Sequence, residues 1–87
     1  MPKSIHRPEY DVLRRMLRQA RLDAGLTQAA LSSALGRSQS YISDIERGVR
    51  RLDVLELRDL LAEVGQDIAD FVTRFEARNR RRVRESV

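Results

Sequence analysis

Polar side chains that can hydrogen-bond to a base edge gather in one short stretch, residues 38–47. They are Gln39, Ser40, Ser43, Asp44 and Arg47. An amide can pair bidentately with adenine, a hydroxyl can approach either groove edge, and a carboxylate can accept from the amino group of cytosine. The stretch therefore has the chemistry to read bases in a major groove. The same composition also suits an ordinary solvated helix face, so the residues alone leave both interpretations open.

Two short helices joined by a tight turn are expected to position these side chains. Thr27 is a good N-cap, and apolar residues then recur on one helical face as far as Gly36, which suits a left-handed C-terminal turn. Ser38 is a second N-cap candidate, and Gly48 ends the helix that it opens. Only Gly36 and Arg37 remain to turn the chain, so the two helices must cross steeply. This crossing is the geometry of a helix-turn-helix.

The stretch TQAALSSALGRSQSYISDIERG, residues 27–48, resembles the Cro and CI repressor-like (xenobiotic-response-element) family of bacterial and phage DNA-binding proteins. The threonine and glutamine that open the family's second helix match Thr27 and Gln28. The family's recognition-helix motif matches Ser40, residues 42–46 and Gly48. The resemblance extends over about residues 10–70. It implies an all-α fold, a compact five-helix bundle of the lambda-repressor-like DNA-binding type, with the helix-turn-helix at helices 2 and 3.

The matching positions imply roles for particular residues. Those that read bases in the family fall on Gln39, Ser40, Ser43 and Asp44. At the Asp44 position relatives often carry a basic or amide residue, and an acid there repels phosphate. Gln28 matches a usual phosphate contact. Arg21 and Glu46 match a family ion pair between the first helix and the recognition helix, so we expect a partly buried, hydrogen-bonded pair.

Basic residues surround the predicted recognition helix and continue into the loop VRRLD that follows it. Beyond Gln28, contacts with the DNA backbone are expected from Arg37, Ser38, Tyr41, Arg47, Arg50 and Arg51. The next segment is acidic and carries Asp53, Glu56, Asp59, Glu63, Asp67 and Asp70. This separation of charge would orient one end toward phosphates and hold the other end away.

Apolar periodicity predicts further helices on either side of the pair. The first runs from Glu9 to a stop at Gly25 and exposes Arg14, Arg15 and Arg18 to solvent. Its apolar stripe is Tyr10, Leu13, Leu17, Ala20 and Ala24. The fourth helix begins after Asp53, which forms a reciprocal capping signature with Glu56, and ends at Gly65.

The last helix is expected to begin at Asp67 and carries an apolar stripe. The stripe is Ile68, Phe71, Val72 and Phe75. It can complete the core or leave an edge free for a partner subunit. One recognition helix contacts too few base pairs for the preference over random DNA that a regulator needs. We therefore expect a homodimer joined through this stripe, with Tyr10 and Leu13 beside it, on an inverted repeat in double-stranded DNA.

The chain divides into a flexible lead-in (1–8), the helix-turn-helix domain (9–77) and a basic C-terminal tail (78–87). The tail contains five arginines and one glutamate, so it supplies the whole net charge of +4. The last helix can extend into the tail by a turn or more, but like-charged neighbours oppose helix formation, so we expect a partly disordered tail. It is a candidate for contact with phosphates or the minor groove, and the tail or the last helix is a candidate for binding a protein partner.

Other classes of function lack the residues they need. The chain of 87 residues has no cysteine and a single histidine, His6, in the lead-in, so we expect no metal site, no cofactor and no catalysis. No apolar run approaches the roughly 20 residues of a membrane span, and the N-terminus lacks the hydrophobic centre of a signal peptide. We expect a cytoplasmic protein without membrane contact, encoded by a bacterium or phage.

The sequence predicts a sequence-specific duplex DNA-binding transcriptional regulator, most simply a repressor, that reads the major groove with helix 38–47. Two alternatives stay open. One is the antitoxin of a toxin–antitoxin pair, which represses its own operon and engages the toxin through the last helix or tail. The other is a protein-interaction adaptor without DNA binding, which the acidic Asp44 permits.

Overall fold

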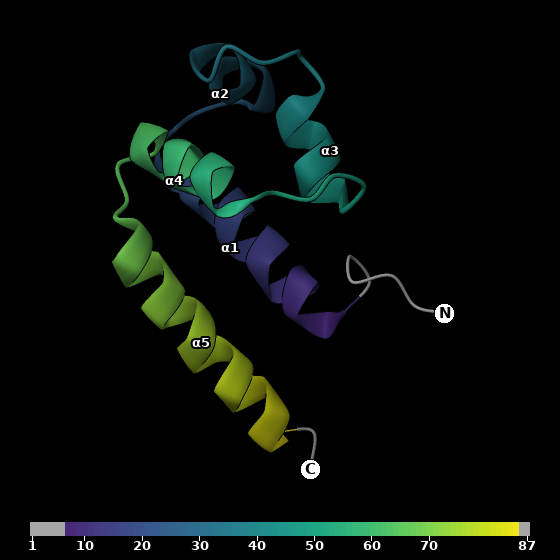
Figure 1. The fold of residues 1–87 in the computed structure, drawn as a ribbon, viewed down its shortest axis with the longest axis vertical. Coiled ribbons are helices and arrows are strands. Elements are labelled where there is room, and N and C mark those ends of the chain that lie inside the picture. Colours follow the sequence, from purple (N-terminus) through teal and green to yellow (C-terminus); the bar gives the residue numbers. More distant parts are fainter. Residues whose placement is uncertain (1–6, 86–87) are drawn as a thin grey trace.

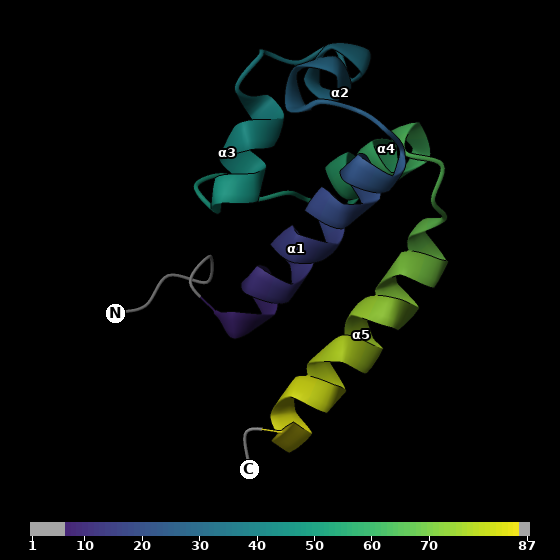
Figure 2. The same cartoon turned by 180° about the vertical axis from the view of Figure 1, so that it is seen from behind.

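Five helices and no strand make up residues 7–85, the part of the chain that the computed structural model describes (Figures 1 and 2). They are α1 (Pro8–Asp23), α2 (Gln28–Ala34), α3 (Tyr41–Arg47), α4 (Val54–Glu63) and α5 (Ile68–Glu85). The predicted all-α fold with its helix-turn-helix at α2 and α3 is confirmed. Most of the predicted lead-in, including His6, lies outside the described residues. Between residues 7 and 85, no helix is both long and apolar enough to cross a membrane.

Helix α1 is the centre of the arrangement. It packs against α3 on one side and against α5 on the other, and both views show it between these two helices (Figures 1 and 2). All five helices supply buried apolar residues: Met16, Leu17, Ala20, Leu31, Tyr41, Ile42, Ile45, Leu60, Leu61 and Phe71. Met16 was not in the predicted stripe of α1, whereas Ala24 was and is exposed.

Local capping explains where several helices begin. Pro8 occupies the first turn of α1. The Thr27 hydroxyl accepts from the amide of Ala30 at 3.0 Å, which confirms the predicted cap of α2. At α4, Asp53 accepts from the amide of Glu56 at 2.8 Å, and the Glu56 carboxylate accepts from the amide of Asp53 at 3.0 Å. Both halves of the predicted capping box are therefore present.

The start of α3 differs from the prediction. The helix begins at Tyr41, and the residues before it form a turn in which the Tyr41 amide donates to the Ser38 carbonyl at 3.0 Å. Ser38 therefore does not cap α3. The cap comes from α2, where the fully buried Ser32 accepts from the amide of Ile42 at 3.1 Å. A hydroxyl from the neighbouring helix thus replaces the local cap, and the connection is longer than the two residues expected.

Helix α5 continues through the segment predicted as a partly disordered tail, so that prediction is wrong. The helix is 18 residues long and ends at Glu85. Packing against α1 compensates for the repulsion among its arginines. Asn79, only 8 % exposed, and the partly buried Arg82 show that this packing continues into the segment, and the Asn79 amide donates to the Phe75 carbonyl at 3.0 Å.

The apolar stripe of α5 is divided between the core and the surface. Phe71 is 1 % exposed and belongs to the core, so its assignment to a dimer interface is wrong. Ile68 and Phe75 are partly buried against the core. Val72, at 42 % exposed, is the residue of the stripe that faces solvent most openly.

Candidate nucleic-acid interface

A buried ion pair joins α3 to α1. Arg21 Nε lies 2.7 Å from Glu46 Oε2, Arg21 Nη2 donates to Glu46 Oε1 at 3.0 Å, and both side chains are 8 % exposed. Arg21 Nη1 also donates to the Leu26 carbonyl at 2.9 Å, and Gln28 Nε2 donates to Glu46 Oε1 at 2.9 Å. The structure thus places the residues of the expected pair in bidentate contact. The surrounding hydrogen bonds fix the rotation of α3 about its axis.

A second arginine of α1 holds the C-terminal end of α3. Arg14 Nη1 donates to the Glu46 carbonyl at 3.0 Å, and Arg14 Nη2 pairs with Asp11. Gly48 has φ +81°, and a Cβ there would lie 3.1 Å from Arg14 Nε, so both the backbone and the close approach favour glycine. A cation at this end is also favoured by the helix dipole. Arg14, which was expected to be solvated, is therefore partly buried, with 30 % of its side chain exposed.

The predicted base-reading residues share the exposed side of α3 and the turn before it. Gln39 and Ser40 are exposed in the turn, and Ser43 and Asp44 are partly exposed on the helix. The Ser43 hydroxyl donates to the Ser40 carbonyl at 3.0 Å, which leaves its oxygen available as an acceptor. Arg47 Nη2 donates to Asp44 at 2.7 Å. The negative charge of Asp44 is therefore partly neutralised by Arg47, which lies on the same helix.

Four residues at the edge of this surface form what we call the Tyr41 cluster: Arg37, Tyr41, Arg50 and Glu56. The guanidinium carbons of Arg37 and Arg50 lie 4.7 and 4.9 Å from the centroid of the Tyr41 ring. Both arginines also donate to the same oxygen, Glu56 Oε2, at 3.2 and 3.0 Å. Cation–π contact and a shared carboxylate thus bring two cations together beside α3.

Three members of the Tyr41 cluster, namely Glu56, Tyr41 and Arg50, have pKa values shifted from their ordinary values. The hydrogen bond from the Asp53 amide, followed by that from Arg50, lowers the pKa of Glu56. Burial, followed by the charge of Glu56, raises the pKa of Tyr41, and the hydrogen bond to Glu56 raises the pKa of Arg50. At neutral pH the cluster therefore contains two cations, one carboxylate and a neutral phenol, with a net charge of +1.

The structure separates three of the predicted backbone-contact residues from the exposed surface around α3. Gln28 is engaged by Glu46, and Tyr41 is only 5 % exposed, beneath its two arginines. Arg51 points toward α1, where its Nε donates to the Tyr10 hydroxyl at 3.2 Å. Arg37, Ser38, Arg47 and Arg50 remain exposed around α3.

Three residues that support this surface were not predicted to do so: Arg14, Ser32 and Glu56. Glu56 was expected only to form the capping box of α4. Arg14 lies two helical turns before Arg21, on the same face of α1, and this spacing was the available signal. Ser32 carried no such signal, because its partner lies on the next helix.

A family model described as helix-turn-helix (HTH_3) matches residues 17–71, which include α2, α3 and the buried ion pair. A solved structure described as an XRE-family like protein, from Pseudomonas syringae pv. tomato str. DC3000, is 40 % identical to the chain with a TM-score of 0.78. The match covers 85 % of this chain and 90 % of that one. This chain belongs to the XRE family of helix-turn-helix proteins.

Membership of the XRE family confirms the resemblance found in the sequence. The family is one of DNA-binding transcription regulators, and its fold is regulatory rather than typically enzymatic. A comparison of the sequence with curated proteins found no match. For an XRE-family protein, the exposed side of α3 and the Tyr41 cluster together form the candidate DNA interface.

Proposed function

We propose that this chain is a sequence-specific repressor that reads duplex DNA through the turn at Gln39 and Ser40 and through the exposed side of α3. The observation that carries the proposal is a short helix, polar on its exposed side, whose first turn is held by Ser32 and whose last turn is held by Arg14 and the Arg21–Glu46 pair. A reading helix must hold its side chains in register with base edges. Rigid attachment supplies this register before DNA binds.

Some residues of the proposed interface contact base edges, and others contact the DNA backbone. Gln39, Ser40 and Ser43 present an amide and two hydroxyls, and Asp44 can accept from cytosine once Arg47 offsets its charge. Arg37 and Arg50, already aligned by Tyr41 and Glu56, are suited to a phosphate oxygen. Ser38 and Arg47 flank them, whereas Arg51, which donates to the Tyr10 hydroxyl of α1, is set apart from this surface. Gln28 supports α3 indirectly, through its hydrogen bond to Glu46 of the ion pair.

A homodimer supplies the specificity that a single reading helix lacks. Two copies related by a two-fold axis would place their α3 helices in successive major grooves about 34 Å apart. We assign the interface to Val72 and Phe75 of α5, with Tyr10 and Leu13 of α1 beside them. Tyr10, Leu13 and Phe75 line a common hollow of about 410 Å³. A dimer bound across a promoter in the bacterial cytoplasm would repress by excluding polymerase.

Selection of bound duplexes from a random pool tests this proposal. The parent protein should enrich an inverted motif whose half-sites are about one helical turn apart. Two variants should be selected in parallel: Gln39→Ala, which removes a proposed reading group, and Arg58→Gln, which removes an exposed charge from α4. Gln39→Ala should lose preference at one base pair of each half-site, and Arg58→Gln should return the parent motif. Absence of any enriched motif for the parent would contradict sequence-specific binding.

A further inference from the structure

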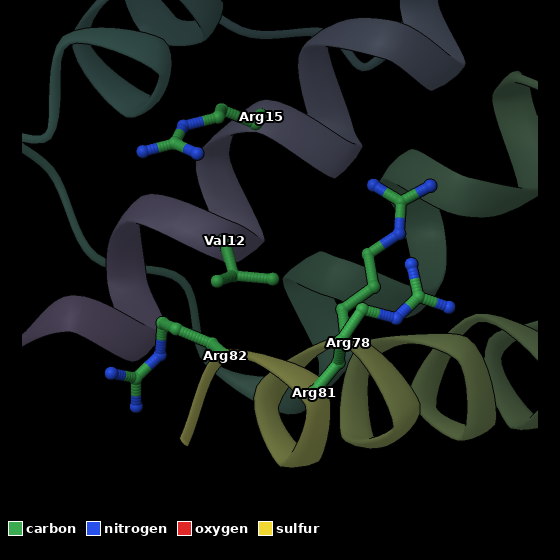
Figure 3. Close-up of a pocket in the computed structure, with 5 residues that line it drawn as sticks. All are labelled: Val12, Arg15, Arg78, Arg81 and Arg82. Carbon is green, nitrogen blue, oxygen red and sulfur yellow. The ribbon is translucent and has the colours of Figure 1, made fainter. Parts of the chain in front are cut away.

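A groove between α1 and α5 is lined almost entirely by arginines. Its lining residues are Val12 and Arg15 from α1 and Arg78, Arg81 and Arg82 from α5, around a volume of about 310 Å³ (Figure 3). Figure 3 shows Val12 pointing from α1 toward α5, with the side chains of Arg78 and Arg81 on one side of it in this view and those of Arg15 and Arg82 on the other. We call this feature the arginine groove. It combines an apolar floor with four positive charges and no lining carboxylate.

The charges of the arginine groove are poorly compensated. Arg15, Arg78 and Arg81 form no ion pair with any side chain that the structure describes. Arg82 likewise forms no ion pair among the described side chains, although its charge contributes to lowering the pKa of Glu9, after the hydrogen bonds from the Glu9 backbone and Arg7. Its Nε is nevertheless buried without a hydrogen-bond partner among the described groups. Arg82 Nε is thus a donor without an acceptor beside a groove whose lining contains no carboxylate.

Helix stability does not account for this concentration of charge. Arg78, Arg81 and Arg82 stand three and four residues apart on α5, a spacing at which like charges destabilise a helix. Arg15 adds a further positive charge from the facing helix. An anion bound among them would convert this repulsion into charge-assisted hydrogen bonds, because guanidinium groups match the geometry of phosphate oxygens.

The arginine groove is separate from the candidate DNA interface. It lies between α1 and α5, whereas α3 packs on the other side of α1 (Figures 1 and 2). Its five lining residues all fall outside residues 17–71, the segment that matches the helix-turn-helix family. Neither the reading of bases nor the shared family segment therefore explains it.

We propose that the arginine groove binds a small free anion that carries two or more linked phosphate groups. Four arginines supply more positive charge than one phosphate neutralises, and they line the volume from both helices. A linked phosphate chain can reach guanidinium groups on α1 and α5 at once, so its binding would join the two helices. Because α1 separates the arginine groove from α3, such an anion and duplex DNA can be bound together.

Calorimetric titration of the full chain with sodium tripolyphosphate, at about 150 mM salt, tests the proposal. The site variant is Arg78→Gln/Arg81→Gln, and the control is Arg18→Gln/Arg58→Gln, which removes the same charge from exposed positions outside the arginine groove. Glutamine keeps a helix propensity close to that of arginine, so both double variants should fold. The site variant should bind about tenfold more weakly or worse, and the control should change by less than about twofold. Equal weakening of both variants would overturn the proposal.

Thermal unfolding and DNA binding give two further tests. Saturating tripolyphosphate should raise the Tm of the parent and of the control but not that of the site variant, and orthophosphate should have a smaller effect. On random duplex DNA, the parent and the site variant should show the same slope of log affinity against log salt. If the site variant lowers that slope by about two while the parent fails to bind tripolyphosphate, the arginine groove serves the DNA backbone and the proposal is wrong.

Discussion

Replacing Glu46 by glutamine tests the contact that fixes α3 to the rest of the protein. Glutamine keeps the shape of the side chain but removes its charge. The Arg21 guanidinium, in a side chain that is 8 % exposed, would lose the carboxylate that it now contacts at 2.7 and 3.0 Å. Removing one partner of a buried ion pair costs about 3 to 5 kcal/mol, because the remaining charge is neither paired nor hydrated. The two remaining hydrogen bonds, from Arg21 to Leu26 and from Gln28, place the expected cost near 3 kcal/mol.

An exposed ion pair on the same helix is the matched control. Asp44 and Arg47 also meet at 2.7 Å, but their side chains are 32 % and 67 % exposed. Asp44→Asn should therefore cost less than about 1 kcal/mol. For a domain of this size each kcal/mol lowers Tm by roughly 4 to 8 °C, so Glu46→Gln should lower it by at least about 12 °C.

Urea denaturation followed by circular dichroism at 222 nm measures both costs. The double variant Arg21→Met/Glu46→Leu should recover most of the lost stability, because it removes both buried charges together. DNA affinity should still be reduced in that variant, since α3 loses the contacts that orient it. If Glu46→Gln unfolds within about 0.5 kcal/mol of the parent, or no lower than Asp44→Asn, the buried pair does not carry the role assigned to it.

Three further predictions follow from the support around α3 and from α5. Ser32→Ala leaves the Ile42 amide buried without an acceptor and should cost about 1 to 3 kcal/mol in urea denaturation, whereas the exposed Ser33→Ala should stay within about 0.5 kcal/mol of the parent. Glu56 has a lowered pKa, so its contribution to stability is present above the ordinary value of 4.5 and is lost as the pH falls through its folded value. The difference in unfolding free energy between the parent and Glu56→Gln should therefore shrink below pH 4.5, and a constant difference from pH 7 to pH 2 would contradict the assignment. Val72→Asp should give a folded monomer in sedimentation velocity, while Leu55→Asp, also exposed but on α4, should remain a dimer; a monomeric parent at micromolar concentration refutes the interface.

Features set by neighbours in the chain were predicted well from the sequence. The caps at Thr27 and Asp53 and the left-handed turns at Gly36 and Gly48 depend on residues within one helical turn, and all four are present. The start of α3 was misplaced because Ser38 satisfied the local rule for a cap. The structure uses Ser32 instead, ten residues before its partner and on another helix. No local pattern distinguishes the two serines.

The remaining differences have a common physical origin in contacts between distant parts of the chain. Repulsion among the arginines of α5 correctly describes an isolated helix, but packing on α1 outweighs it, and the sequence does not show that α1 lies alongside. Glu56 forms part of the capping box of α4 and also contacts Arg37 and Arg50, and only the capping box was predicted. Its place in the capping box accounted for an acid at that position, so its contact with Arg37, 19 residues away, was not expected.

The most direct test of the central claim compares Gln39→Ala with Arg50→Ala on a selected duplex and on a random one, each over a range of salt concentrations. If α3 and its turn read bases, Gln39→Ala should lose about 1 to 3 kcal/mol of binding free energy on the selected duplex only. Arg50→Ala should weaken both duplexes alike and lower the slope of log affinity against log salt by about one. Equal losses for Gln39→Ala on the selected and random duplexes would contradict base reading at this position.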